Sequence, residues 1–385
     1  MNEDINNQLK KKMDNKKIFE LNENIDNKYN ELKKLINNIE YKIKKKYIFK
    51  KSPLNLQYKF EITNTNSNSG WSDVFEVFLS YKDNIEYIVS ANSKNFYLDL
   101  YELKTNKKIN HFKGHENDIS TIRYFLNKKN NYKEYLISCD YNRFVIIWDI
   151  SSDFKKIQTI KTQYLSYIYS CLLIFPYNSN NDFIVTSSND VSNISINSAT
   201  IIYSLNTGKY IKHFNNSINN AIFYLLSWFN IKNNNYYIIE IARYKIFINN
   251  LLKEELYCEL HHEPEETHLS GFIYYKDKNN YLCTSSTNGF INIWDLFKKK
   301  IFQQIDTNKC YLTHIIEWNQ KYIIVADFKT NSFKIVDFEE KKLIKGINGP
   351  DFSRILSIKK IYHPKYGESL LVSNDKNCIH LFTVQ

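Results

Sequence analysis

The chain has 385 residues, 43% of them hydrophobic, and its formal net charge is +11. Only four of its 52 basic residues are arginine, which argues against guanine or phosphate recognition by arginine as the main function. It has no phosphate-loop, GxSxG or HExxH motif, which excludes the metabolic enzyme classes that depend on those motifs.

The positive charge is concentrated at the N-terminus. Residues 1–51 contain 14 Lys and 8 acidic residues, whereas the other 334 residues have 38 basic and 33 acidic groups. The body of the chain is therefore mixed in charge, and nucleic acid is not the expected partner.

Residues 1–51 are predicted to form a basic amphipathic helix of coiled-coil type. Lys28 and Lys42 interrupt an otherwise apolar series at positions a and d of one heptad frame, formed by Ile18, Leu21, Ile25, Leu32, Leu35 and Ile39. Two roles remain open, self-association through residues 18–43 or docking of a lone helix on its own domain. The segment from Lys42 to Lys51 could be a nuclear-import signal, a patch for acidic surfaces or simply the solvated end of the helix, which Ser52-Pro53 terminates.

Beyond Pro53 the apolar residues alternate, as they do in β-strands. Two stretches are almost superimposable, LISCDYNRFVIIWDI at 136–150 and LCTSSTNGFINIWDL at 282–296. Each reads as a strand, a tight polar turn and a second strand that ends in Trp-Asp. Trp148 and Trp294 are 146 residues apart, which fits three repeats of about 49 residues.

The same spacing extends in both directions and gives seven repeats. The corresponding strand-end residues are Tyr101, Trp148, Tyr203, Asn249, Trp294, Val336 and Phe382, at intervals of 47, 55, 46, 45, 42 and 46 residues. The one long interval coincides with an Asn- and Ser-rich insertion at 188–198, which is predicted to be an extended loop.

These residues resemble the WD40-repeat β-propeller family. The resemblance depends on Gly114-His115, on Trp148-Asp149 and Trp294-Asp295, and on the sevenfold spacing from about Trp71 to the C-terminus. It implies an all-β fold, a seven-bladed propeller over residues 52–385 preceded by the N-terminal helix. It also implies four strands in each blade.

In that family, His, Ser or Thr, Asp and Trp form a buried hydrogen-bond network within a blade. His115, Ser138 and Trp148 match three of these places, and Asn142 stands where we expect the acid. In the fifth repeat Thr284 and Trp294 match, with Asn288 in the place of the acid. The resemblance implies that these residues are structural and that the protein has no catalytic residues.

The ring should be closed by the two ends of the repeat region. Residues 56–62 alternate in strand fashion before the first repeat, whereas the last repeat lacks a fourth strand. We therefore expect strand 56–62 to pair with residues 379–384, which removes an exposed sheet edge.

Partners of such propellers bind the face built by the loops that lead into each first strand and by the turns between second and third strands. Aromatic residues and arginine dominate binding hot spots. The candidates on this face are Trp71, Asp73, Tyr141, Arg143, Tyr164, Phe290, Asp351, Phe352 and Arg354.

No cofactor or metal site is expected. The segment HHEPEETH at 261–268 gathers possible metal ligands, but its spacing and its lack of thiolates fit a solvated loop better. The six dispersed cysteines form no CxxC pair and indicate reduced thiols in a cytoplasmic or nuclear protein. The longest apolar run, residues 221–229, is too short to span a bilayer.

The predicted function is a non-catalytic scaffold for protein–protein interactions, with the N-terminal helix for oligomerisation or docking. Three alternatives remain. The chain could be a substrate receptor of a ubiquitin ligase, although Ser151 and Phe297 stand where ligase-docking relatives often have arginine. It could be an RNA-associated component of a ribonucleoprotein complex, acting through the basic helix. It could also be a propeller enzyme, with carboxylates around a central channel.

Overall fold

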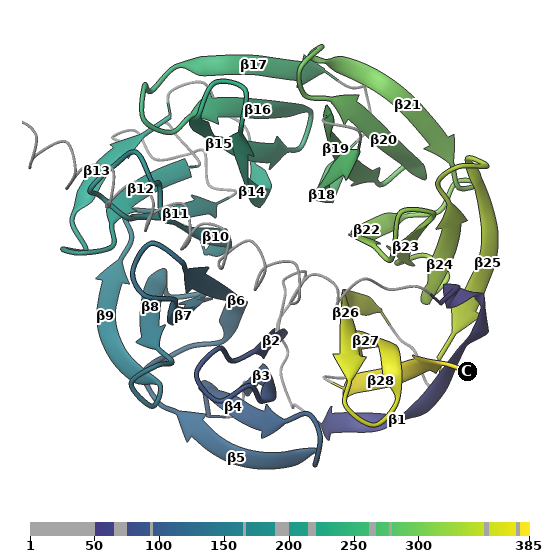
Figure 1. Cartoon of the computed structure of the whole chain (residues 1–385), viewed down its shortest axis with the longest axis horizontal. Helices are drawn as coiled ribbons and strands as arrows, with labels where there is room; N and C mark the ends of the chain where they lie inside the picture. The colour runs from purple at the N-terminus through teal and green to yellow at the C-terminus, as the bar shows by residue number, and fades with distance from the viewer. Residues whose placement is uncertain are drawn as a thin grey trace, which may run out of the picture. The chain divides into compact units, whose positions relative to one another are not determined.

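Seven four-stranded antiparallel sheets follow one another around a ring (Figure 1). The computed structural model describes residues 51–64, 75–92, 95–164, 167–188, 200–214, 221–261, 267–276, 279–349, 354–374 and 378–385. Except for Lys51, the helix predicted for residues 1–51 lies outside them. The residues from Lys51 to Gln385 belong to one compact unit.

The first four blades occupy the N-terminal part of the ring. Blade 1 contains β2 (Phe75–Leu79), β3 (Glu86–Asn92), β4 (Tyr97–Glu102) and β5 (Lys107–Phe112). Blade 2 contains β6 (Ile119–Asn127), β7 (Lys133–Asp140), β8 (Phe144–Asp149) and β9 (Lys155–Lys161). Blade 3 contains β10 (Ile168–Ile174), β11 (Phe183–Ser188), β12 (Thr200–Ser204) and β13 (Tyr210–His213). Blade 4 contains β14 (Ile222–Asn230), β15 (Asn235–Ala242), β16 (Lys245–Asn250) and β17 (Leu256–His261).

The last three blades complete the ring. Blade 5 contains β18 (His268–Lys276), β19 (Asn279–Ser286), β20 (Phe290–Asp295) and β21 (Lys300–Asp306). Blade 6 contains β22 (Leu312–Glu317), β23 (Tyr322–Asp327), β24 (Ser332–Asp337) and β25 (Lys342–Asn348). Blade 7 contains β26 (Ile355–His363), β27 (Gly367–Asn374), β28 (Cys378–Val384) and, as its fourth strand, β1 (Leu56–Asn64). A short 3-10 helix, η1 (Pro53–Asn55), precedes β1.

The burial of each strand follows from its place in the blade. The first strands surround the centre of the ring and the fourth strands form its outer edge (Figure 1). The second and third strands are almost entirely buried, as in β7 and β8, because neighbouring blades cover both their faces. Fourth strands such as β9 are mostly exposed. The core is therefore distributed between the blades.

The repeat residues found in the sequence occupy one equivalent place in all seven blades. Each lies in a third strand, opposite an aliphatic residue of the second strand, such as Leu136 opposite Trp148 and Ile238 opposite Asn249. At the same residue the register to the fourth strand shifts. The seven-bladed fold that the sequence predicted is thereby confirmed.

The long interval between repeats has a local explanation. The second strand of blade 3, β11, ends at Ser188, and its third strand, β12, begins at Thr200. The insertion at 188–198 therefore falls between two strands of one blade and leaves their pairing intact.

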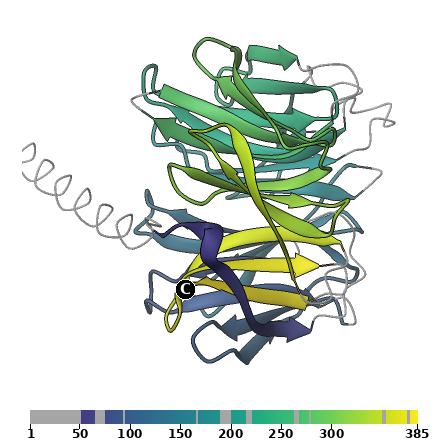
Figure 2. The same cartoon turned by 90° about the vertical axis from the view of Figure 1, so that its right-hand side faces the viewer.

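The ring closes where β1 pairs antiparallel with β28, with Leu56 opposite Val384 and Glu61 opposite His380. Figures 1 and 2 both show β1, in purple, beside the yellow β28. Side chains from blades 6 and 7 hold the segment that leads into β1. The Trp318 indole donates to the Lys51 carbonyl at 2.9 Å, and the Lys51 amide donates to Glu368 at 2.8 Å.

The described residues contain no helix with the length and apolar character that a bilayer crossing would require.

Candidate binding mouth

A cavity of about 370 Å³ opens on one face of the ring, near its centre. We call it the mouth pocket. Its lining comes from blades 2 to 7, from first strands, from the residues just before them and from turns between second and third strands. The lining residues are Arg123, Tyr169, Phe223, Tyr224, Arg243, Tyr244, Thr267, Leu269, Thr287, Tyr311, Thr313, His314, Phe328, Ile355 and Leu356. This is the face on which the sequence placed the partner-binding surface.

The lining is aromatic and cationic. It contains four tyrosines, two phenylalanines, two arginines and a histidine, and none of the described lining residues is Asp or Glu. Such a pocket favours an anionic group attached to an apolar or aromatic stem.

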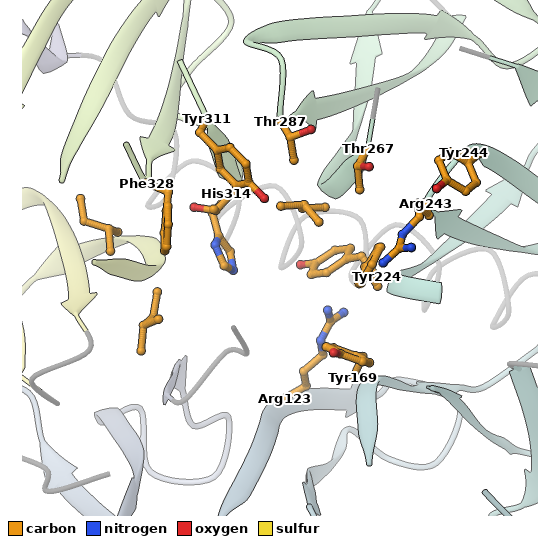
Figure 3. Close-up of a pocket in the computed structure, with 15 residues that line it drawn as sticks. Arg123, Tyr169, Tyr224, Arg243, Tyr244, Thr267, Thr287, Tyr311, His314 and Phe328 are labelled. Atoms are coloured by element: carbon orange, nitrogen blue, oxygen red, sulfur yellow. The ribbon is translucent and has the colours of Figure 1, made fainter. Parts of the chain in front are cut away.

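Arg123 lies at the base of the mouth pocket. It lies in the first strand of blade 2 and is only 9% exposed. Its Nη1 donates to the Leu225 carbonyl in blade 4 at 3.2 Å, and its guanidinium lies 4.4 Å from the Tyr224 ring centre. Figure 3 shows Arg123 and Arg243 both pointing toward the space near Tyr224. Because Arg123 is fixed by a hydrogen bond and an aromatic ring, little side-chain entropy remains to be lost on binding.

Two other guanidinium groups lie at the rim. Arg243, in the turn between β15 and β16, is exposed and lies 5.8 Å from the ring centre of Tyr244, which is itself 54% exposed. Arg354, just before β26, lies 5.0 Å from the ring centre of the lining residue Phe328. Positive charge therefore extends from the base of the pocket to its rim.

A row of aromatic rings leads into the pocket across blades 2 to 4. Tyr141 packs on Tyr167 with ring centres 4.8 Å apart, Tyr167 on Tyr169 at 5.1 Å, and Tyr169 on Phe223 at 5.6 Å. Burial, and then the hydrogen bond to Tyr167, raise the pKa of Tyr169, so its hydroxyl stays protonated and neutral. We call these four rings the aromatic row.

The predicted partner-binding residues differ in their exposure and in their contacts. Tyr141 and Arg143 lie in the turn between β7 and β8, and both are partly exposed. Arg143 donates to the Tyr164 carbonyl at 2.5 Å, so its guanidinium is already bound within the chain. Phe290 begins β20 and is partly buried. The other candidates of this face, Trp71, Asp73, Asp351 and Phe352, lie outside the described residues.

Tyr164 is not a surface residue, and that prediction is wrong. It is 3% exposed, its hydroxyl donates to the Thr186 carbonyl at 2.7 Å, and it accepts from the Ile201 amide at 3.1 Å. Both partners belong to blade 3. Tyr164 therefore anchors the segment that leads into that blade.

The structural network of blade 2 contains a carboxylate. His115 Nδ1 lies 2.8 Å from Asp140, His115 Nε2 lies 2.6 Å from Ser138 Oγ, and the Trp148 indole donates to Ser138 Oγ at 2.9 Å. The acid is therefore Asp140, two residues earlier than predicted. Asn142 instead accepts a bond from Asn117 on the surface. Asp140 is the last residue of β7, and its other carboxylate oxygen accepts from the Phe144 amide at 2.9 Å.

Blade 5 keeps only part of this network. Trp294 donates to Thr284 Oγ1 at 3.0 Å, but Ser286 stands where blade 2 has Asp140. The prediction that Asn288 replaces the acid is wrong, because Asn288 accepts a bond from Ser286 within its own turn.

None of the residues that line the mouth pocket was predicted from the sequence. Arg123, Tyr169, Tyr224 and His314 lie inside first strands, where the sequence gives no sign of which side chain faces the centre. One feature of the sequence did indicate the face of the pocket, namely the positions of the arginines. The chain has only four arginines, and each falls in a first strand, just before one, or in a turn between second and third strands.

Seven antiparallel blades arranged in one ring define a seven-bladed β-propeller. The family model named WD domain, G-beta repeat matches residues 106–149, which run from the fourth strand of blade 1 to the third strand of blade 2. Residues 106–149 therefore match one WD40 repeat, and the remaining blades have the same four-stranded topology. No curated protein matches the sequence. WD40 propellers are generally non-catalytic, and their partners are proteins.

Proposed function

We propose that this propeller is a non-catalytic interaction scaffold whose mouth pocket captures an acidic segment of a partner protein. The observation that carries the proposal is the distribution of arginine. Lysine supplies 48 of the 52 basic residues, yet all four arginines belong to the face that contains the pocket. Arginine differs from lysine in its planar fork, which binds a carboxylate through two parallel hydrogen bonds.

The aromatic lining adds contact area to this charge. Carboxylates would meet Arg123 at the base and Arg243 at the rim, and the neighbouring apolar side chains of the segment would lie along the aromatic row. Tyrosine and arginine contribute most of the energy in many protein interfaces because they combine large apolar surfaces with directional hydrogen bonds. The cavity lies at the small end of ligand pockets, so it accommodates one or two side chains and not a folded domain.

Fluorescence polarisation tests the proposal with a short labelled peptide of alternating Glu and Phe and a matched peptide with Gln in place of Glu. We expect the Glu peptide to bind, the Gln peptide to bind far more weakly, and added salt to weaken the Glu complex. Arg243→Gln should reduce affinity about tenfold or more. Because Arg243 is exposed, this substitution should leave the fold intact.

Lys253→Gln is the matched control. It removes the same charge from the turn between β16 and β17, which lies on the opposite face because successive turns of a blade alternate between faces. Equal binding of the two peptides, or equal losses in both variants, would refute the proposal. RNA retention by the full chain at moderate salt, lost when residues 1–51 are removed, would favour the RNA alternative instead.

We further propose that residues 18–43 form a helix for self-association or docking, supported by their heptad pattern. Light scattering on the full chain and on the chain beginning at Lys51, together with limited proteolysis of the full chain, distinguishes the two roles. A mass that falls to the monomer value on truncation supports self-association, whereas a monomeric full chain in which residues 18–43 resist proteolysis supports docking on the propeller. If the full chain is monomeric and this segment is cleaved rapidly, the helix has neither role.

A further inference from the structure

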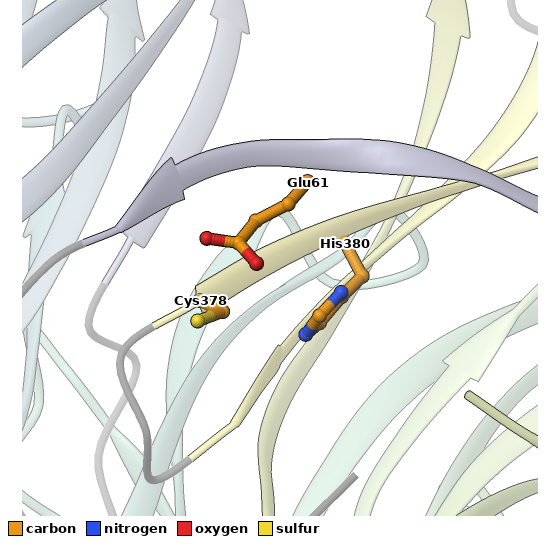
Figure 4. A group of neighbouring side chains, drawn as sticks. All are labelled: Glu61, Cys378 and His380. Carbon is orange, nitrogen blue, oxygen red and sulfur yellow. The ribbon is translucent and has the colours of Figure 1, made fainter. Parts of the chain in front are cut away.

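Three potential metal ligands meet where the ring closes. Cys378 and His380 are two residues apart on β28, so their side chains point to the same face of the sheet. Glu61 lies directly opposite His380 on β1. One ligand atom from each of the three residues lies within 4.8 Å of the other two, and Figure 4 shows the side chains gathered over the seam. We call them the seam triad.

We propose that the seam triad binds a divalent ion of zinc type and so links the two ends of the propeller. Thiolate, imidazole and carboxylate are the three ligand types that zinc takes in proteins. With bond lengths of about 2.0–2.3 Å, tetrahedral ligands lie roughly 3–4 Å apart. The three atoms must therefore approach one another by about 1 Å, and a water molecule completes the tetrahedron.

The different burial of the three side chains suits this closure. His380 is only 3% exposed, whereas Cys378 is half-buried and Glu61 is exposed. Asn374 fixes the two residues of β28, because its Oδ1 accepts from the Cys378 amide at 3.1 Å and its Nδ2 lies 3.2 Å from His380 Nε2. The exposed Glu61 is thus free to swing toward a rigid Cys–His pair. Coordination through Nε2 exchanges the amide contact for a bond to the metal.

Binding has a defined proton balance. The Cys378 thiol loses its proton to the solvent as the sulfur–metal bond forms, while the imidazole binds through a nitrogen that carries no proton. Affinity should therefore rise with pH, and each bound ion should release a proton. No oxidation or reduction takes place.

The location gives the ion a structural consequence. Within the described residues, β1 and β28 are the paired strands of one blade that lie at opposite ends of the sequence. An ion held by both strands binds the closed ring and not the open one, so it shifts the equilibrium toward closure. The site is independent of the mouth pocket, since the two share no residue.

Titration of the tag-free full-length protein with Co²⁺ tests this proposal, because a cobalt–thiolate bond absorbs in the near ultraviolet. We expect one equivalent of Co²⁺ to bind and to produce that absorption. Added Zn²⁺ should displace the bound Co²⁺, and the absorption should then disappear. Saturating Zn²⁺ should raise Tm by about 2–5 °C. Cys378→Ser should abolish the thiolate absorption, and Glu61→Gln should weaken binding about tenfold or more.

Cys258→Ser is the matched control, because Cys258 is also half-buried and lies on β17, away from the seam. It should leave the titration unchanged. The proposal is overturned if no thiolate absorption develops, or if the absorption survives Cys378→Ser. It is equally overturned if Zn²⁺ binds without raising Tm. Glu61→Gln changes an exposed side chain, so its result does not depend on a variant that fails to fold.

Discussion

At the scale of single residues, the Ser138 hydroxyl contacts two other buried side chains of blade 2. Its hydroxyl accepts from the Trp148 indole and lies against His115, whose other nitrogen meets Asp140. In the neutral imidazole, Asp140 accepts from Nδ1, so Nε2 accepts from Ser138. All four side chains are buried. One hydroxyl therefore satisfies two buried nitrogen atoms at once.

Ser138→Ala should destabilise the protein more than Thr284→Val. The first change leaves buried nitrogen atoms of both His115 and Trp148 without their partner, and we expect a loss of about 2–4 kcal/mol. The second removes only the partner of the Trp294 indole and keeps the side-chain shape, for a loss of about 1–2 kcal/mol. Equilibrium unfolding in urea measures both values. Equal losses would contradict the idea that the hydroxyl of blade 2 serves two partners.

At the scale of elements, the turns between strands join one blade to the next. His363 ends β26 and is 1% exposed. Its Nδ1 accepts from the Lys365 amide at 3.1 Å, and its ring packs 4.7 Å from that of Tyr366. Burial lowers the pKa of His363 to about 4, with a contribution in the same direction from Lys365, although a hydrogen bond to the Leu103 backbone in blade 1 opposes the shift.

This histidine should make the stability of the protein sensitive to pH. Its folded pKa lies below its unfolded value of 6.5, so the unfolded chain binds the proton more readily. The stabilisation is complete above pH 6.5 and is lost as the pH falls toward 4, by at most about 3 kcal/mol. His363→Asn keeps an acceptor for Lys365 but cannot titrate. The free energy of unfolding of this variant should depend less steeply on pH between 6.5 and 4, and an unchanged slope would count against this account.

At the scale of the whole molecule, closure of the ring decides how the blades are held. In each of the first six blades, all four strands come from one continuous stretch of chain, whereas blade 7 takes its fourth strand from residues 56–64. Without β1, the edge of β28 would be exposed and ready to pair with another chain. The hydrogen bonds from Trp318 and to Glu368 at Lys51 show that neighbouring blades hold the start of this strand.

Two truncations separate the N-terminal segment from the closing strand. The chain that begins at Lys51 retains the whole propeller unit, so its Tm should stay within a few degrees of the full chain. The chain that begins at residue 65 lacks β1 and should melt at a much lower temperature and aggregate. Thermal unfolding and size-exclusion chromatography measure the two effects. Similar behaviour of both truncations would show that β1 contributes little to closure.

Much of this architecture could be predicted from the sequence, because a repeated blade repeats its local signals. The spacing from Tyr101 to Phe382 gave the number of blades, and alternation of apolar residues gave the strands. Trp148, Ser138 and His115 could be assigned to one network since each falls at a fixed place in its repeat. The prediction placed the acidic position of this network two residues too late, at Asn142 instead of Asp140. The end of β7 and the turn after it both carry polar side chains, and the sequence does not show which of them faces the network.

The burial of Tyr164 could not be predicted from the sequence. An aromatic residue in a connecting segment has the same appearance in the sequence whether it points outward or into a seam, and its hydrogen bonds to Thr186 and Ile201 form only after blade 3 has folded.

The sequence by itself determined the repeat, the number of blades and the restriction of arginine to a few places, because these depend on residues close together in the chain. Only the tertiary structure decided which side chains face the mouth pocket, as when Arg123 meets Leu225 from a strand 102 residues away. It also brought Glu61 to Cys378 and His380. Such contacts depend on how the blades turn and pack around the ring, and no local pattern of residues records that geometry.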